Sequence, residues 1–535
     1  MIGLALAAGL ALAAPPEQPP RLVIVIAVDQ LRADYMDRFR GHFGTGGFNL
    51  FLERGARFAR GRYEHSTTST CPGHAVILTG SYGNVNGIIG NDWYDAVRGE
   101  EEYCAADRGV QLIGSAAEGR SPKNLIGATV GDVLKVHTGG QSRVVTVSAK
   151  DRSAIMLGGH LADAAYWMED TLFVTSTYYM NALPDWARDF NRNGTVTAYR
   201  GKQWDRLLPA GAYAMVGPDV VAAEEDDAGG RAFPHPMGGP SATHAQFVDA
   251  FDQSPFGNEV VADFAMRAMT AERLGRDSVT DVLGVSFSAN DRVGHAYGPE
   301  SHEVMDVTVR LDRVLERFFA FVDREVGLEN VLVVLTADHG VSPMPEVVTA
   351  GNPNATARRI HPDSVAAAVT AALDARFGAP GRAWIAWHDQ PDMHLDLTLL
   401  AERGVDLAEA EQVARDAVAA VPGIYSALTG TERAALRRAG VRTGDVLSYQ
   451  PGRSGHVYYH ADPYNYVDDD VTGADHGSRW GYDQQVPILW FGPRIAAGTY
   501  YTEAAVADIA PTISALVGVL APGGSQGRVL AEMLK

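Results

Sequence analysis

The sequence predicts an α/β protein in which a mostly parallel central sheet is sandwiched between helices and carries inserted cap subdomains. Apolar, β-branched runs at Leu22–Val28, residues 282–288 and residues 330–335 are typical of strands that are buried on both faces. Each run ends in a polar loop, and regularly spaced apolar residues within 304–322 mark a long amphipathic helix. This alternation of strand, polar loop and helix favours a parallel sheet with both faces covered.

The chain has 535 residues, of which 46% are hydrophobic, and this is enough for one large core with insertions. Residues 160–280 show weaker periodicity and many aromatic, Gly and Pro residues, so we expect a cap over the active face there. Residues 346–454 are rich in Ala and Arg and read as an inserted α+β subdomain. The predicted order is a signal peptide (1–14), a Pro-rich leader (15–21), a first core segment with the nucleophile loop (22–159), the cap (160–280), a second core segment with the metal motifs (281–345), the α+β subdomain (346–454) and a third core segment (455–535).

The first residues indicate export. Residues 1–14 are almost wholly apolar or small, and Ala11, Leu12 and Ala13 form the A-x-A pattern of a secretory signal peptide. This segment is too short to span a bilayer, and no later segment offers about 18 uncharged apolar residues. We therefore expect a periplasmic or secreted protein without stable membrane association. The net charge of −20 argues against nucleic-acid binding.

The two cysteines, Cys71 and Cys104, leave two alternatives open. Export makes a disulfide between them compatible with the compartment, and two buried free thiols are the other reading. Cys71 is also a competing nucleophile in its loop. An oxidising compartment disfavours a reactive free thiol, so we rank this below a hydroxyl nucleophile.

A hydroxyl-rich loop, H-S-T-T-S-T-C-P-G-H at residues 65–74, precedes a short apolar segment that stops at Gly80. Pro near the start and Gly after the end are the usual punctuation of a short helix. A hydroxyl, foremost that of Thr70, should therefore lie at a helix N-terminus, where free N–H groups and the helix dipole favour an anion. This placement suits a nucleophile that attacks phosphorus or sulfur. Taken alone, the stretch is better explained as a Ser/Thr-rich capping loop, and the rest of the chain decides between the two.

Carboxylates and histidines gather in the loops that follow the buried strands. Three carboxylates and three imidazoles together suit Zn²⁺ or a similar divalent metal. Six such ligands are enough for two metals, and two metals about 4 Å apart hold the attacking and leaving oxygens of an in-line phosphoryl displacement. Each ligand has an ordinary explanation by itself, as a helix-surface pair, a strand-end turn or a solvated histidine. The candidate ligands are Asp29, Asp291, His295, Asp338, His339 and His476.

Seven short motifs, taken together and in order, resemble the alkaline phosphatase superfamily: V-D-Q-L-R, T-C-P-G-H-A, G-N-D-W-Y-D, K-D-R-S-A, D-R-V-G-H, T-A-D-H-G and H-G-S. More narrowly, they resemble its monomeric, periplasmic, phosphate-irrepressible type with a threonine nucleophile, found in sphingomonads and flavobacteria. The resemblance extends from about residue 22 to the C-terminus.

The resemblance implies two zinc ions and a role for each matched residue. Thr70 matches the nucleophile, and Asn91 matches an amide that donates to a phosphoryl oxygen. Lys150 and Arg152 match the pair that contacts the remaining phosphoryl oxygens. One zinc would be held by Asp291, His295 and His476, and the other by Asp29, Asp338, His339 and the oxygen of Thr70.

We therefore expect a monomeric alkaline phosphatase that hydrolyses small-molecule phosphate monoesters through a phosphothreonine intermediate. The K-D-R motif favours monoesters, because cations grip the non-bridging oxygens of a dianion, whereas a diester would prefer an apolar pocket. Two alternatives remain. One is a nucleotide phosphodiesterase/pyrophosphatase of the same superfamily, and the other is an exported metal- or phosphate-binding protein without turnover. A sulfatase is disfavoured, because Cys71-Pro72-Gly73-His74 does not fit C/S-x-P-x-R.

One further stretch, Asp189-Phe190-Asn191-Arg192-Asn193-Gly194, resembles the start of a calcium loop. The twelfth position of that pattern would be Arg200 rather than Glu. We therefore expect a plain Asn/Gly turn there. A protein that binds a calcium ion in addition to two zinc ions remains an alternative to one that binds zinc alone.

Overall fold

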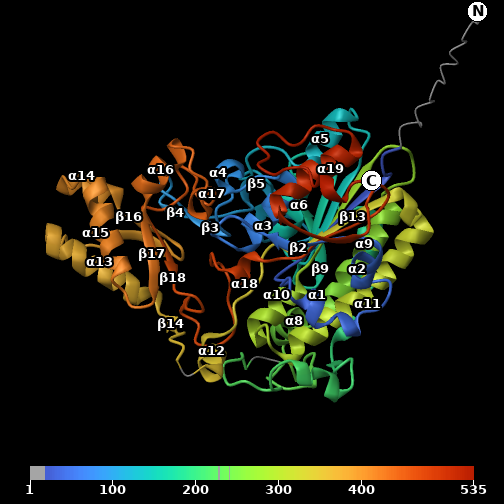
Figure 1. Ribbon diagram of the computed structural model, residues 1–535, viewed down its shortest axis with the longest axis horizontal. Helices are drawn as coiled ribbons and strands as arrows, with labels where there is room; N and C mark the ends of the chain where they lie inside the picture. Colours follow the sequence, from blue (N-terminus) through green and yellow to red (C-terminus); the bar gives the residue numbers. More distant parts are fainter. Residues whose placement is uncertain (1–17, 227–228, 240, 353) are drawn as a thin grey trace, which may run out of the picture.

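The computed structural model describes residues 18–226, 229–239, 241–352 and 354–535, so the predicted signal peptide and the first three residues of the predicted leader lie outside the described residues. An eleven-stranded sheet forms the centre, in the order β21-β2-β20-β13-β1-β12-β7-β8-β9-β5-β6 (Figure 1). Its strands are β1 (Leu22–Val28), β2 (Ala56–Arg62), β5 (Ala106–Ile113), β6 (Glu118–Arg120), β7 (Val144–Ser148), β8 (Ala164–Glu169), β9 (Leu172–Ser176), β12 (Asp281–Phe287), β13 (Val331–Thr336), β20 (Ile488–Phe491) and β21 (Gly498–Ala505).

The middle of the sheet is parallel, as predicted. β1 lies between β12 and β13, and β7 and β8 continue the parallel order beyond β12. The prediction of a mostly parallel sheet is confirmed, and three strands depart from it. β20 runs antiparallel between β13 and β2, whereas β2 and the edge strand β21 run parallel to each other. At the other edge β9 and β6 are reversed relative to β8 and β5. A buried apolar run such as β20 carries no signal for its direction, so the sequence did not indicate these reversals.

Helices cover both faces of the sheet (Figure 1). On one face α3 (Thr70–Thr79) packs against α5 (Val130–His137), α6 (Asp151–Gly158) and α19 (Ile509–Val517). On the other, α9 (Phe256–Ala271) packs against β12, β7 and the long α11 (His302–Glu325), and α2 (Phe48–Arg54) completes the layer. The expectation of an α/β fold sandwiched by helices is confirmed.

A second unit projects from one side of the molecule, drawn in yellow and orange in Figure 1. Its antiparallel sheet has the order β15-β16-β18-β17 and is covered by α13 and α15, which share a separate hydrophobic cluster with it. This unit matches the predicted α+β subdomain, but its boundary at 454 is too early, because β18 is a central strand of this sheet. The elements are α13 (Pro362–Phe377), β15 (Ile385–Asp389), β16 (Asp392–Leu395), α15 (Leu407–Ala419), β17 (Ile424–Thr429) and β18 (Val457–Ala461).

One further expectation needs correction. The range 160–280 is not wholly a cap, since β8 and β9 belong to the central sheet and α9 covers it. In the third core segment the Thr- and Tyr-rich stretch of β21 forms an edge strand, and α19 begins after it at Ile509. Within the described residues, no helix combines the length and the apolar character needed to cross a bilayer.

Candidate active site

The helix α3 begins at Thr70, as predicted, and ends before Gly80, which adopts the left-handed conformation with φ of 65°. Its first turn lies against the loop after β13. A Cβ atom at Gly73 would lie 2.2 Å from the carbonyl oxygen of Asp338, so only glycine permits this approach. The Tyr63 hydroxyl bridges the two segments by donating to the carbonyl oxygens of Gly73 (3.1 Å) and Ala337 (2.9 Å). The hydroxyl loop is thereby held at the end of the central strands.

The first group of predicted ligands comprises Asp29, Asp338 and His339, which follow the neighbouring strands β1 and β13. All three side chains are fully buried, and each offers a ligand atom within 4.8 Å of the others. His339 Nε2 lies 3.4 Å from Asp29 Oδ1 and 3.5 Å from Asp338 Oδ2. The structure therefore brings these predicted residues together at the carboxyl end of the parallel strands, where open α/β sheets bind ligands.

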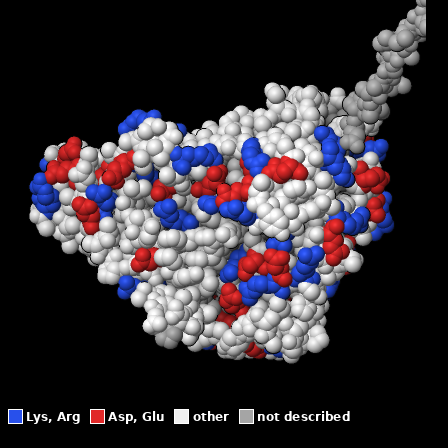
Figure 2. Space-filling model, in the orientation of Figure 1, with Lys and Arg blue, Asp and Glu red and all other residues white. Residues whose placement is uncertain are grey.

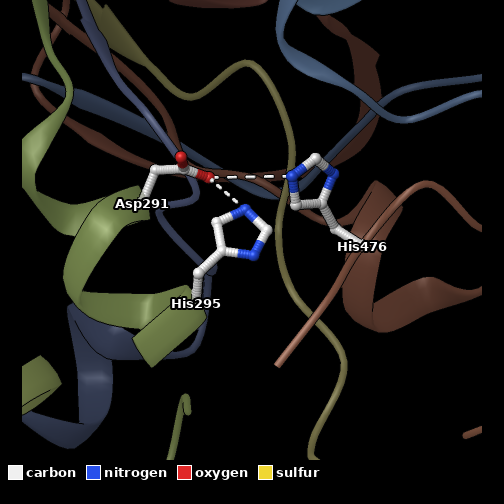
Figure 3. Close-up of side chains that lie close together, drawn as sticks. All are labelled: Asp291, His295 and His476. Atoms are coloured by element: carbon white, nitrogen blue, oxygen red, sulfur yellow. Dashed lines mark ion pairs between the residues drawn. The ribbon is translucent and has the colours of Figure 1, made fainter. Parts of the chain in front are cut away.

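The second group comprises Asp291 and His295, one turn apart on α10 (Ala289–Tyr297), and His476 from the loop before α18 (Gly481–Gln484). Figure 3 shows both imidazole rings directed at one carboxylate oxygen. His295 Nε2 lies 3.2 Å and His476 Nε2 3.6 Å from Asp291 Oδ1. Residues from distant segments of the chain thus converge as the sequence predicted.

Each of the three histidines is oriented by a backbone carbonyl. The Nδ1 atoms lie 2.7 Å from the oxygen of Ala474 for His295, 2.8 Å from that of Thr68 for His476, and 2.9 Å from that of Gly340 for His339. Because a carbonyl oxygen only accepts, Nδ1 carries a proton in each ring, and Nε2 is left as the atom that can bind a metal ion. This is the arrangement in which proteins hold metal-ligating imidazoles.

The residues of the first group fit a divalent metal ion. Asp29 Oδ1, Asp338 Oδ2 and His339 Nε2 are buried and have no hydrogen-bond partner, which is costly for polar atoms without a ligand. Burial, followed by repulsion from Asp291 and Asp338, raises the pKa of Asp29 well above its usual range. Burial also lowers the pKa of His339, which keeps the imidazole neutral. Crowded carboxylates beside neutral imidazoles are a donor set that suits zinc.

Lys150 links the two groups. Its Nζ lies 2.7 Å from Asp29 Oδ2 and 2.5 Å from Asp291 Oδ2. Burial by itself raises the pKa of Asp291, but Lys150 and His295 outweigh it and hold this pKa well below its usual range. Burial lowers the pKa of His295, and the Asp291 carboxylate outweighs that effect and raises it to about 9. The carboxylates of Asp29 and Asp291 therefore favour a cation in the space between the two ligand groups.

Arg152 lies in the first turn of α6, and its Nε is buried without a hydrogen-bond partner. Asp151 lies between Lys150 and Arg152 in the sequence. Its carboxylate accepts hydrogen bonds from the Tyr103 hydroxyl (2.5 Å) and from Arg120 Nε (2.8 Å). With Asp151 engaged in this way, Arg152 and Lys150 line a cavity of about 190 Å³. The guanidinium is thus available for an anionic ligand.

Asn91 is clamped from both sides by the two cysteines. The Cys71 N–H donates to Asn91 Oδ1 (2.9 Å), and the Cys104 N–H donates to the Asn91 carbonyl oxygen (2.8 Å). Cys71 and Cys104 form a disulfide. The question left open by the sequence is thereby settled in favour of the bridge, and Cys71 is not a free nucleophile. Since Oδ1 is occupied, the amide Nδ2 is the group of Asn91 that can donate to a ligand.

We expect the double substitution C71A/C104A to weaken the protein and its anion site together. Opening a loop whose ends are 33 residues apart should lower the free energy of unfolding by about 3–4 kcal/mol. Alanine keeps the two main-chain N–H groups that hold Asn91, but the bridge no longer ties them to each other, so inhibition by inorganic phosphate should weaken while the metal content stays unchanged. Thermal denaturation, inhibition assays and metal analysis measure these effects. Unchanged phosphate affinity in the variant would show that the bridge only stabilises the fold.

Sequence reasoning missed Gln30, which ties the two groups to each other. Its backbone N–H donates to Asp338 Oδ1 (3.1 Å), and its Nε2 donates to Asp291 Oδ1 (2.9 Å). Gln30 adopts a left-handed conformation with φ of 64°, unusual for a residue with a side chain. A Cβ atom at Gly294 would lie 1.7 Å from Gln30 Oε1, so this glycine makes room for the amide. No pattern in the sequence signals this conformation.

Sequence reasoning also missed His74, the last residue of the hydroxyl loop. Its Nδ1 lies 2.9 Å from the Thr70 carbonyl oxygen and 3.2 Å from Asp338 Oδ2, and its Nε2 lies 2.8 Å from Ser286 Oγ. His74 thus joins the nucleophile helix to the first group and to β12. Its place one turn after Thr70 in the predicted helix is the signal that could have identified it.

The stretch that resembles a calcium loop forms the end of α7 (Asp185–Arg192), followed by a turn. Across the described ranges, two groups bring three metal-binding side chains together, and Asp189 belongs to neither.

Comparisons with known proteins agree with this geometry. The family model for type I phosphodiesterase / nucleotide pyrophosphatase matches residues 23–479. The alkaline phosphatase PhoV of Synechococcus elongatus is 34% identical over 523 residues, which are 96% of this chain and 93% of PhoV. A protein of Myroides odoratus named calcium-transporting ATPase is 30% identical over 535 residues, covering 98% of this chain and 96% of that protein.

The alkaline phosphatase PafA of Elizabethkingia meningoseptica is 31% identical over 522 residues, covering 96% of this chain and 94% of PafA. The crystal structure of PafA superimposes with a TM-score of 0.90 and covers 98% of this chain and 100% of that one. The chain therefore belongs to the type I phosphodiesterase / nucleotide pyrophosphatase family within the alkaline phosphatase superfamily, in the branch that includes PhoV and PafA.

Proposed function

We propose that the protein is an alkaline phosphatase that hydrolyses small-molecule phosphate monoesters through a phosphothreonine intermediate at a two-zinc site. One observation carries the proposal: the segment that bears Thr70 contacts both ligand groups. The Thr68 carbonyl holds His476 of the second group, and Gly73 packs on the Asp338 backbone of the first. Thr70 lies between these two contacts, at the start of a helix whose N-terminus favours an anion.

The assigned residues divide into ligands and phosphate contacts. Zinc at these positions would lower the pKa of the Thr70 hydroxyl and stabilise charge on the attacking and leaving oxygens. Thr70 attacks phosphorus in line as the bond from phosphorus to the alcohol oxygen breaks and the alcohol leaves. Water that enters from the side of the departed alcohol then attacks the phosphothreonine, and the bond from phosphorus to the Thr70 oxygen breaks to release inorganic phosphate. Asn91 Nδ2 and the Arg152 guanidinium bind the non-bridging oxygens and position them. Asp29, Asp338, His339 and Thr70 would hold one zinc, and Asp291, His295 and His476 the other, on the side of the leaving oxygen.

Lys150 has a second task in this proposal. Its ammonium now neutralises the carboxylates of Asp29 and Asp291. With metal ions bound, both carboxylates would be neutralised, and Lys150 would be free to bind a phosphoryl oxygen beside Arg152. A monoester dianion offers enough non-bridging oxygens for both cations and for Asn91, whereas a diester replaces one of them by an organic group. Lys150 and Arg152 therefore favour monoesters.

A solved variant of PafA, with a TM-score of 0.89 and 30% identity to this chain, carries substitutions of one threonine, one asparagine, one lysine and one arginine. These are the residue types that we assign to the nucleophile and the phosphate contacts here. The family model that matches the chain is named after phosphodiesterases and pyrophosphatases, so a nucleotide phosphodiesterase is the alternative that the experiment must separate. A metal- or phosphate-binding protein without turnover is the other.

Arg152→Ala should lower monoesterase kcat/KM about 100-fold, because a charged donor to the transferred phosphoryl group is lost. Residual hydrolysis of a methyl aryl phosphate diester should change little. The two rates are measured on an aryl phosphate and on its methyl ester. Arg292→Ala is the matched control, since Arg292 lines the same cavity without an assigned contact to the phosphoryl group. Equal losses on both substrates would contradict the monoesterase assignment.

We also propose that the mature protein is a monomer that is exported to the periplasm or secreted. The Cys71–Cys104 disulfide supports export, because such bridges form and persist in oxidising compartments.

A further inference from the structure

A cavity of about 240 Å³ adjoins the proposed phosphate site, because Asn91 and His476 form part of its wall. The opposite wall comes from the second unit, through the turn between β15 and β16, and from β3 (Asp92–Asp95) of the first unit. Figure 1 shows β3 and β4 (Glu100–Tyr103) facing that unit across the molecule. The cavity therefore lies beside the ligand group that contains His476, which we assign to the leaving oxygen.

The wall of this cavity is strongly acidic. Asp92, Asp389, Asp392, Asp468 and Asp475 line it, and its lining contains no Lys or Arg among the described residues. Asp392 is the one of these five that forms an ion pair with a basic side chain within the described residues, through Arg433 at 3.3 Å. Burial, followed by repulsion from Glu101, raises the pKa of Asp92 and that of Asp389 to about 6. Both face the cavity and remain charged at alkaline pH, and the positive charge of Arg152 offsets the rise in the pKa of Asp92 only in part.

The neighbouring cavity that contains Lys150 and Arg152 differs in its charges. Its lining holds three basic residues, Lys150, Arg152 and Arg292, beside four acidic ones. Basic side chains therefore line the side where the phosphoryl group binds, together with acidic ones, whereas the lining of the cavity on the alcohol side has acidic side chains and, among the described residues, no Lys or Arg. Figure 2 shows that the outer surface, by contrast, mixes both signs of charge.

An indole also borders the acidic cavity. Trp387 lines it, and its Nε1 donates to Glu101 Oε2 (3.0 Å), which fixes the ring beside the carboxylates. Trp93 lines the cavity from the other unit. Aromatic faces and carboxylates together are the surroundings that bind an ammonium or a quaternary ammonium group.

We propose that this cavity receives the alcohol part of the substrate and selects phosphate monoesters whose alcohol carries a positive charge, the esters of amino alcohols. The inference rests on the proposed function, which places the leaving oxygen at Asp291, His295 and His476. A cation in the cavity is attracted by the carboxylates, whereas an anionic leaving group, including the further phosphates of a nucleotide, is repelled. The phosphate and the alcohol are thus recognised by surfaces of opposite charge.

Three esters of similar size test this: phosphocholine, its neutral carbon isostere 3,3-dimethylbutyl phosphate, and the anionic phosphoglycolate. With the zinc-loaded enzyme at pH 8.5, about two pH units above the range in which phosphate esters titrate, kcat/KM should fall in that order. We expect the kcat/KM of phosphocholine to exceed that of the neutral isostere about tenfold. Two or more exposed carboxylates and an indole each contribute modestly to the binding of the cation. The double variant D92N/D389N should reduce this ratio to near one and leave kcat/KM for the neutral ester unchanged.

Asp416→Asn is the matched control, because it removes one exposed carboxylate of the second unit that does not line the cavity, and it should preserve the ratio. Equal kcat/KM for phosphocholine and its isostere would overturn the inference. In that case the hydrolysis of both esters would still support the proposed function. A uniform loss on all three esters in D92N/D389N would also overturn it, since the two carboxylates would then act on folding. Failure to hydrolyse any of the three would instead refute the proposed function, and the inference with it.

Discussion

Thr70→Ala should reduce turnover of an aryl phosphate by at least about ten thousand-fold, as loss of a nucleophile does in other covalent mechanisms. The reason is that the hydroxyl at the first position of α3 supplies the attacking oxygen, and no neighbouring group within the described residues occupies the same place. The six side-chain ligands of the two groups remain in the variant, so the metal content should stay close to that of the native protein. Steady-state kinetics and elemental analysis measure both quantities.

Thr70→Ser is the matched control, because it keeps the oxygen and removes only a methyl group. It should retain a large share of the activity. Substantial activity in Thr70→Ala would contradict the assignment and move the nucleophile to Thr68 or Ser69. Cys71 is excluded from this role by its disulfide.

Removal of the metals by a chelator should abolish activity and lower the melting temperature. Without cations, Asp29, Asp338 and His339 keep buried polar atoms that lack partners, and the carboxylates repel one another. A ligand at about 1,000 times its Kd contributes about 4 kcal/mol of stability, so two bound ions should matter for the fold as well as for catalysis. Calorimetry and activity assays, before and after chelation, give the two readouts.

Added Zn²⁺ should restore both properties, and the titration should need two ions per chain. His476→Ala is an informative variant, because it removes a ligand of one group only and should lower the metal content toward one ion. A melting temperature that does not respond to chelation would contradict the assignment of these residues as ligands.

The parallel centre of the fold was predictable because its strands are buried on both faces. β1 matches its prediction residue for residue, and β12 and β13 are displaced by one position. The ligands were predictable for a related reason. Residues that follow parallel strands must meet at one edge of the sheet, so Asp29, Asp338 and His339 converge whatever the loops between them do.

The remainder depended on contacts that a linear pattern does not contain. The direction of β20, the pairing of β8 and β9 with the main sheet, and the strand β21 follow from packing between distant segments. The left-handed conformation of Gln30 accompanies its two hydrogen bonds to carboxylates of different segments, Asp291 in α10 and Asp338 in the loop after β13. The acidic cavity is assembled from β3 and the β15–β16 turn, which lie far apart in the sequence, so neither segment alone indicates it.

The orientation of the three histidines has a consequence for how this protein tolerates substitution. His295, His339 and His476 each direct Nδ1 at a main-chain oxygen, and every residue type supplies such an oxygen. Replacing the side chain of Ala474 or Thr68 therefore leaves the accepting oxygen in the chain. Gly340 is the exception, because a Cβ atom there would lie 2.1 Å from the carbonyl oxygen of Tyr482 and would force the backbone to move. Loss of ring orientation requires a shift of the backbone path, so point mutations at Ala474 and Thr68 should be buffered, whereas insertions and deletions in these loops should not. A library of loop-length variants would accordingly lose metal far more often than a library of single substitutions at the same positions.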